Sequence, residues 1–176
     1  MNENTQKQCA KIVKMGTPKS AWNYVMDILP VLEHVQNTSF NFDDAQYTKS
    51  NERLYVSDTY QKSLLEIARQ IEKGLTWKDV GDSTALERFQ KIKGNINKSK
   101  SIGSYDFKLI GRAEPQMNFI LLAHKDGTSE VLFNWDFRNI PHDPVVHLAK
   151  DRDIYGMYSA HFIDLWRVAV KNYDNI

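Results

Sequence analysis

Two histidines and an aspartate, His142, Asp143 and His147, lie close together in the sequence. Histidine and aspartate can bind a metal ion or act as acid and base in the hydrolysis of a phosphodiester. If residues 143–147 are extended, Asp143 and His147 share one face and His142 points away, so the three do not form a compact ligand set. Pro141 and Pro144 also exclude the helix on which two-histidine metal motifs are built. We therefore predict no metal site, and keep a hydrolase or phosphodiesterase that uses these three residues as one hypothesis.

The same stretch has the composition of a recognition loop at the rim of a sheet. Polar and charged side chains follow an apolar strand, and the turn-forming residue types Pro, Asp and Asn are frequent. Trp135 alternates with Val131 and Phe133, which predicts that it packs with them on a buried face and does not line a ligand pocket. The ligand-binding residues that we predict in this loop are Asp136, Arg138, His142 and Asp143.

A basic stretch lies in the middle of the chain. Residues 88–100 contain five cations and no acidic residue, and Tyr105 and Phe107 follow. Such cations can bind phosphates, and aromatic rings can stack on bases. Nucleic-acid binding is therefore a second hypothesis, with the predicted contact residues Arg88, Lys91, Lys93, Lys98 and Lys100.

The composition limits the other classes of function. The chain of 176 residues has a formal net charge of +1, so no overall field attracts nucleic acid or an anionic membrane. Cys9 is the only cysteine and lies on an apolar stripe, where an inert thiol is expected. The sequence carries no glycine-rich phosphate loop, no Gly-x-Ser-x-Gly elbow and no His-Glu-x-x-His motif. We expect a soluble, cytosolic protein that needs no cofactor; these absences favour a protein that is not an enzyme and leave the hydrolase hypothesis open.

In the first hundred residues, the apolar side chains recur at the spacing of helices. Residues 5–15 carry a short apolar stripe that ends at Gly16, and Thr17 precedes Pro18 as an N-cap would. The second helix should end or kink at Pro30. Two further helices are predicted, from Ser57 to Gly74 and over residues 83–93, where Gly94 is the expected stop. Residues 37–51 are expected to form a long loop.

After residue 104 the pattern of apolar residues changes from helical spacing to the alternation that is typical of strands. Strands are predicted over residues 105–109, 115–123, 128–137 and 145–149, with a hairpin turn at residues 124–127, and a final helix is predicted over residues 155–172. We therefore expect one domain, 1–176, with a helix-rich part over 1–100 and a small, mostly antiparallel sheet covered by a terminal helix over 105–176. This order predicts an α+β fold, or an α/β fold if the early helices cross over the sheet.

Six short segments between residues 53 and 170 share a pattern of amphipathic helices and apolar strands: residues 60–68, Gly74, 77–80, 118–121, 130–133 and 161–166. Together they resemble phospholipase D-like domains in bacterial regulatory and defence proteins. Catalytic members of that family carry His-x-Lys followed four residues later by Asp. This chain lacks the motif, since His147 and Lys150 have the wrong spacing. The resemblance therefore implies a non-catalytic sensor or interaction domain.

The main hypothesis is a non-catalytic, cytosolic regulatory or binding module that recognises a protein partner or a small ligand, in bacterial regulation or antiviral defence. Nucleic-acid binding by the basic stretch and hydrolysis by His142, Asp143 and His147 are the alternatives. We expect no membrane partner, and the oligomeric state is left open.

Overall fold

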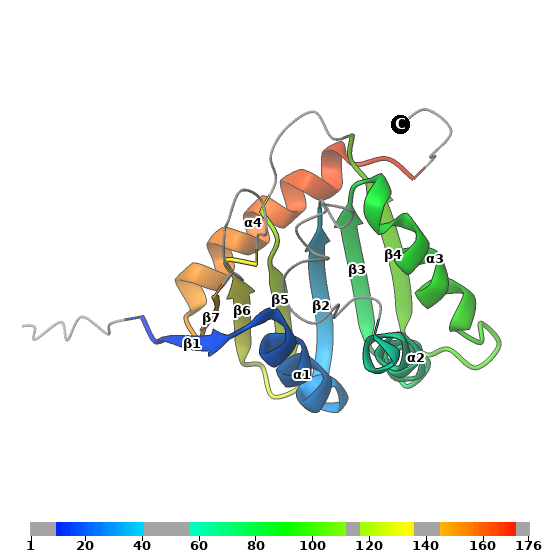
Figure 1. Ribbon diagram of the computed structural model, residues 1–176, viewed down its shortest axis with the longest axis horizontal. Coiled ribbons are helices and arrows are strands. Elements are labelled where there is room, and N and C mark those ends of the chain that lie inside the picture. Colours follow the sequence, from blue (N-terminus) through cyan, green and yellow to red (C-terminus); the bar gives the residue numbers. More distant parts are fainter. Residues whose placement is uncertain (1–9, 41–56, 112–116, 136–144, 172–176) are drawn as a thin grey trace, which may run out of the picture.

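A mixed sheet of seven strands forms the centre of the molecule (Figure 1). The computed structural model describes residues 10–40, 57–111, 117–135 and 145–171. The strands lie side by side in the order β1-β7-β6-β5-β2-β3-β4. They are β1 (Ile12–Gly16), β2 (Leu32–Ser39), β3 (Thr76–Gly81), β4 (Ser104–Leu109), β5 (Ile120–His124), β6 (Ser129–Phe133) and β7 (Val146–Ala149). The helices are α1 (Pro18–Ile28), α2 (Asp58–Glu72), α3 (Leu86–Asn95) and α4 (Arg152–Val168). The predicted mixed class of fold is confirmed.

The sheet has a parallel half and an antiparallel half. Strands β2, β3 and β4 are parallel, and α2 and α3 connect them in turn. Strands β5, β6, β7 and β1 each run antiparallel to their neighbours. Parallel neighbours need a long crossover, which is why the two helices lie between those strands in the sequence.

Helices cover the two faces of the sheet and divide the core into layers. One face packs against α1 and α2 through a cluster that includes Trp22, Ile67 and Trp77, and α3 packs beside them on β4. The opposite face packs against α4 through Phe119, Val131 and other side chains. This arrangement buries apolar side chains on both sides of the central strands, as expected for a sheet with helices on both faces.

The predicted helix starts and stops are confirmed in α1 and α2. The hydroxyl of Thr17 accepts a hydrogen bond from the Ser20 amide, and Pro18 occupies the first turn. After Ile28 the chain tightens into a 3-10 turn that contains Pro30. The hydroxyl of Ser57 accepts from the Tyr60 amide at the start of α2. These contacts satisfy amide groups that a helix leaves free at its first turn.

Three predicted elements differ from the structure. Residues 12–16 form strand β1, and not the end of a helix, because β7 supplies the hydrogen-bonding partner. Leu32–Ser39 forms strand β2, so the loop predicted from residue 37 begins later, and its residues 41–51 lie outside the described residues. Helix α3 runs through Gly94 to Asn95, and the turn before it is capped by Asp82.

Trp135 is buried as predicted, but it lies on the opposite face from Val131. The cause is Asn134, whose φ of 63° breaks the alternation of the strand. Its side-chain amide donates a hydrogen bond to the Val145 carbonyl at 2.9 Å. Trp135 therefore packs in the core layer between the sheet and helices α1 and α2. A simple alternation of the strand would place it in the layer under α4.

Among the described residues, no helix combines the length and apolar character needed to cross a membrane.

Candidate functional site

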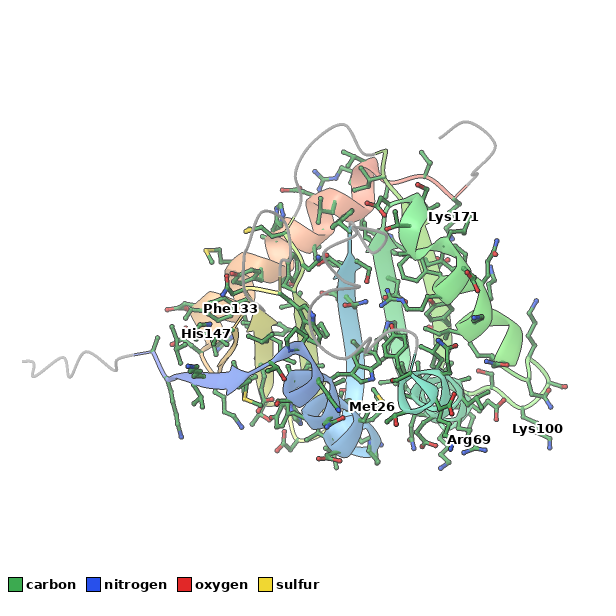
Figure 2. The ribbon with its side chains drawn as sticks, viewed as in Figure 1. Met26, Arg69, Lys100, Phe133, His147 and Lys171 are labelled. Atoms are coloured by element: carbon green, nitrogen blue, oxygen red, sulfur yellow. The ribbon has the colours of Figure 1, made fainter. Side chains whose placement is uncertain are left out.

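The basic stretch of the sequence forms one end of the molecule, where α2 and α3 finish and the chain turns into β4. Lys91 and Lys93 lie in the last turns of α3, and Lys98 and Lys100 lie in the loop that follows. All four are exposed. Figure 2 shows Lys100 projecting at the same end of the molecule as Arg69 of α2. We call this surface, made of Lys73, Lys91, Lys93, Lys98 and Lys100, the basic end.

Lys73 joins the basic end from a different helix. It caps the C-terminus of α2, and its amide donates to the carbonyls of Arg69, Gln70 and Ile71. Lys73 is not among the contact residues predicted from the sequence. Its position just before Gly74, at a helix C-terminus, was the available signal, since cations are favoured there and loops from neighbouring elements meet there.

The carboxylates near the basic end already have partners. Glu87 lies 2.9 Å from Lys91, and Glu66 lies 3.4 Å from Arg69. Glu72 accepts a hydrogen bond of 2.7 Å from the Asn97 amide. Within the described part of the chain, Lys73, Lys98 and Lys100 form no ion pair. The basic end therefore carries positive charge that an anionic ligand can neutralise.

The loop that presents Lys98 and Lys100 is held by hydrogen bonds. The amides of Ile102 and Gly103 donate to the carbonyls of Glu72 and Ile71, at 3.1 and 3.0 Å. The Asn97 side chain accepts from the amide and the hydroxyl of Ser99. A Cβ atom on Gly103 would lie 2.2 Å from the Leu75 carbonyl oxygen, so only glycine fits against the end of α2. Hydrogen bonds to the end of α2 therefore hold the loop that carries the two lysines.

Arg88 differs from the other predicted contact residues because its side chain is only 11% exposed. Its guanidinium lies 3.8 Å from the Asp79 carboxylate, donates to the Tyr60 hydroxyl at 3.2 Å and donates to the Ser39 hydroxyl. Burial alone would lower the pKa of Arg88, but Tyr60 and Asp79 raise it, so the side chain stays charged. We therefore leave Arg88 out of the basic end.

Asp79, in β3, is the centre of this buried network. It accepts hydrogen bonds of 2.6 Å from the Asn37 amide and from the Tyr105 hydroxyl. Burial and the Asp79 carboxylate raise the pKa of Tyr105 well above its ordinary value, which keeps its hydroxyl a donor. The network joins β2, β3, β4, α2 and α3, so it fixes the two helices that carry the basic end.

The recognition loop predicted from the sequence lies mostly outside the described residues. Asp136, Arg138, His142 and Asp143 fall in the range 136–144, which the structure does not describe. His147 lies in β7, where its ring stacks on Phe133 with centroids 5.7 Å apart. In Figure 2 both residues lie on the opposite side of the molecule from Lys100. The predicted ligand and hydrolase sites therefore stay predictions.

Metal binding finds no support among the residues described. No three His, Cys, Asp or Glu side chains in ranges 10–40, 57–111, 117–135 and 145–171 come together as a ligand group.

Comparisons with solved structures identify the fold. TrmBL2, an archaeal chromatin protein whose structure shows a novel mode of DNA binding, matches 96% of this chain and 56% of its own chain, with a TM-score of 0.57 and 11% identity. NucT from Helicobacter pylori matches 92% of this chain and 99% of its own, with a TM-score of 0.50 and 12% identity. NucT is a phospholipase D-family protein. The likeness supports a phospholipase D-like fold. No protein-family model and no curated protein matches the sequence.

The phospholipase D-like fold agrees with the resemblance seen in the sequence, but at these identities it carries no residue roles. The chain spans little more than half the length of the TrmBL2 chain.

Proposed function

We propose that this chain is a nucleic-acid-binding domain with a phospholipase D-like fold, which binds the phosphate backbone through the basic end. The observation that carries the proposal is the set of exposed lysines from two helices and one ordered loop, Lys73, Lys91, Lys93, Lys98 and Lys100. Lysines hold phosphates as point charges and read no base sequence by themselves. The binding is therefore dominated by charge and sensitive to salt.

Two further observations support this function. TrmBL2, which has a similar fold, binds DNA, according to the description of its structure. The ring of Phe107 lies beneath the Lys93 ammonium, 5.3 Å from the ring centroid, which holds that lysine against the sheet. The small net charge of the whole chain, +1, does not oppose the proposal, because a local excess of lysines is enough to attract phosphates.

The basic end offers no group suited to attack a phosphodiester, since its functional side chains are ammonium groups. The proposed role is therefore binding without hydrolysis. The hydrolase hypothesis rests on His142, Asp143 and His147, of which only His147 is described.

The test is the salt dependence of binding to a short labelled DNA duplex, followed by fluorescence anisotropy between 50 and 200 mM salt. The slope of log affinity against log salt is negative, and each lost phosphate contact makes it shallower by about 0.9, so the double variant Lys98→Ala/Lys100→Ala should make it shallower by about 1.8. The matched control is Lys11→Ala/Lys14→Ala, two exposed lysines beside and within β1 at the far edge of the sheet.

The control pair should leave both affinity and slope unchanged. A wild-type protein that does not bind the duplex at low salt contradicts the proposal. So does a larger loss in the β1 control than in the Lys98/Lys100 variant, because the interface would then lie at the other edge.

A further inference from the structure

Ile102 is the most exposed large apolar side chain among the described residues, with 83% of its surface accessible. It lies two residues beyond Lys100, in the loop that carries Lys98. Single exposed apolar residues are common on protein surfaces, so exposure alone indicates nothing. The support beneath Ile102 and the charges beside it distinguish this position.

The backbone on both sides of Ile102 is fixed. Its own amide donates to the Glu72 carbonyl at 3.1 Å, and the next amide, of Gly103, donates to the Ile71 carbonyl at 3.0 Å. The hydroxyl of Ser101 also donates to the Gly103 carbonyl at 3.0 Å. Ile102 is therefore held outward by a loop that is anchored to the end of α2.

The two lysines that precede Ile102 in the loop restrict what can cover it. A surface that contacts Lys98, Lys100 and Ile102 together needs anionic groups at its edge and an apolar interior. A nucleic-acid duplex has both, in its phosphates and its stacked bases. Proteins that kink DNA insert aliphatic wedges such as isoleucine between base steps from the minor groove, and lysines then contact the neighbouring phosphates.

Two other occupants fit less well. Proteins that bind single strands stack bases on aromatic rings, whereas the most exposed apolar side chain of this loop is aliphatic. Stable attachment to a membrane needs a larger apolar anchor or two combined signals, and a single isoleucine with two lysines provides little apolar area.

We propose that Ile102 is a wedge that enters between two base pairs of a DNA duplex and bends it, while Lys98 and Lys100 bind neighbouring phosphates. This inference rests on the proposed function and adds to it the form of the nucleic acid and the deformation. Because pyrimidine–purine steps unstack most easily, the preferred site contains a TA or CA step.

The experiment measures bending by energy transfer between dyes at the two ends of a duplex with one central TA step. Wild-type protein should raise the transfer efficiency, and Ile102→Ala should abolish the rise. Affinity for this duplex should fall about tenfold, as expected for the loss of one buried aliphatic side chain. The slope of log affinity against log salt should be the same for Ile102→Ala as for the wild type, whereas Lys98→Ala/Lys100→Ala makes this slope shallower.

The control variant is Val168→Ala, which shortens another exposed aliphatic side chain at the end of α4. It should leave bending and affinity unchanged. Because both positions are exposed, both variants should fold, and thermal unfolding verifies this.

The outcomes separate the two proposals. If wild type and Ile102→Ala bind and bend the duplex equally, the wedge is refuted and the proposed function stands. If the wild type does not bind the duplex at low salt, the proposed function fails and the wedge fails with it. If Ile102→Ala lowers binding to phosphatidylserine vesicles and leaves duplex bending unchanged, Ile102 is a membrane contact and the wedge is overturned.

Discussion

Asp79 and Arg88 form an ion pair of 3.8 Å between side chains that are 1% and 11% exposed. Asp79 comes from β3 and Arg88 from α3, so the pair joins the sheet to the helix that carries Lys91 and Lys93. A charge buried in this way is stable only while its partners are present. The pair therefore belongs to the support of the basic end and not to its surface.

Replacing Arg88 by methionine should destabilise the protein strongly. The variant leaves the Asp79 carboxylate buried without its ionic partner, and breaking such a pair costs about 3–5 kcal/mol in the free energy of unfolding. Urea denaturation measures the loss. The matched control is Arg69→Met, which removes an exposed partner of Glu66 and should change stability by less than about 1 kcal/mol. An Arg88→Met variant of normal stability that no longer binds DNA would show that Arg88 is a contact residue after all.

Ionisation of the Tyr105 hydroxyl should make the stability of the protein fall as the pH rises in the alkaline range. Burial and Asp79 raise the pKa of Tyr105 in the folded protein above its ordinary value of 10.0. The folded form therefore holds the proton more tightly than the unfolded form, so this stabilisation is complete below pH 10 and is lost as the pH rises further. Unfolding by urea at pH 8 to 11 measures the slope. Tyr105→Phe should lower stability at pH 8 by about 1–3 kcal/mol and show a shallower decline above pH 10. An unchanged slope in this variant would contradict the assignment.

Glu130 should have the opposite pH dependence. This carboxylate is 4% exposed and accepts hydrogen bonds from Tyr24 and, at 2.6 Å, from Lys150. Burial alone would raise the pKa of Glu130, but these hydrogen bonds lower it below the ordinary value of 4.5. Its contribution is therefore present above about pH 4.5 and is lost as the pH falls through the lowered value.

Acid unfolding of Glu130→Gln tests this dependence. The variant should be less stable than the wild type at pH 7, and the difference should shrink toward pH 3. Glu33→Gln, which removes an exposed carboxylate, should follow the wild-type curve. A constant difference at all pH values would exclude ionisation of Glu130 as the cause.

Gly103→Ala should move the loop of the basic end. The added Cβ would lie 2.2 Å from the Leu75 carbonyl oxygen and 2.5 Å from that of Ile71, so the backbone must shift at a cost of about 1–3 kcal/mol. Gly94→Ala is the control, because a Cβ there meets nothing within 4 Å and α3 should gain about 0.5–1 kcal/mol. Denaturation midpoints compare the two. Equal stability of both variants would show that the loop is not pressed against α2.

Local signals in the sequence were sufficient for the elements that carry their own caps and turns. Thr17 before Pro18 and Ser57 before Asp58 marked the starts of α1 and α2 correctly. The hairpin at His124 also formed as predicted, where the amide of His124 donates to the Thr128 carbonyl and Gly127 has a φ of 85°. These features depend on neighbouring residues, so periodicity and turn chemistry detect them.

Features that depend on distant partners were missed. Strand β1 exists because β7 pairs with it, and β3 carries Lys78 and Asp79, whose charges obscure a buried strand. The basic stretch predicted five contact residues, of which Arg88 is buried. Its partners Asp79 and Tyr60 are distant in the sequence, so the sequence pattern around Arg88 does not predict these contacts. A period of two also failed at Asn134, where one positive φ moved Trp135 to the other layer.

The pairing of β1 with β7 has a consequence for the order of folding. Ile12 lies opposite Ala149, so the ribosome must synthesise nearly all of the described chain before β1 can find its neighbour. The β5–β6 hairpin, in contrast, needs only adjacent residues and can form as soon as it emerges. During synthesis β1 is thus an unpaired strand with exposed amide and carbonyl groups, the kind of segment that chaperones and neighbouring chains capture. Its pairing with β7 adds the edge strand of the sheet and is expected to be among the last steps of folding.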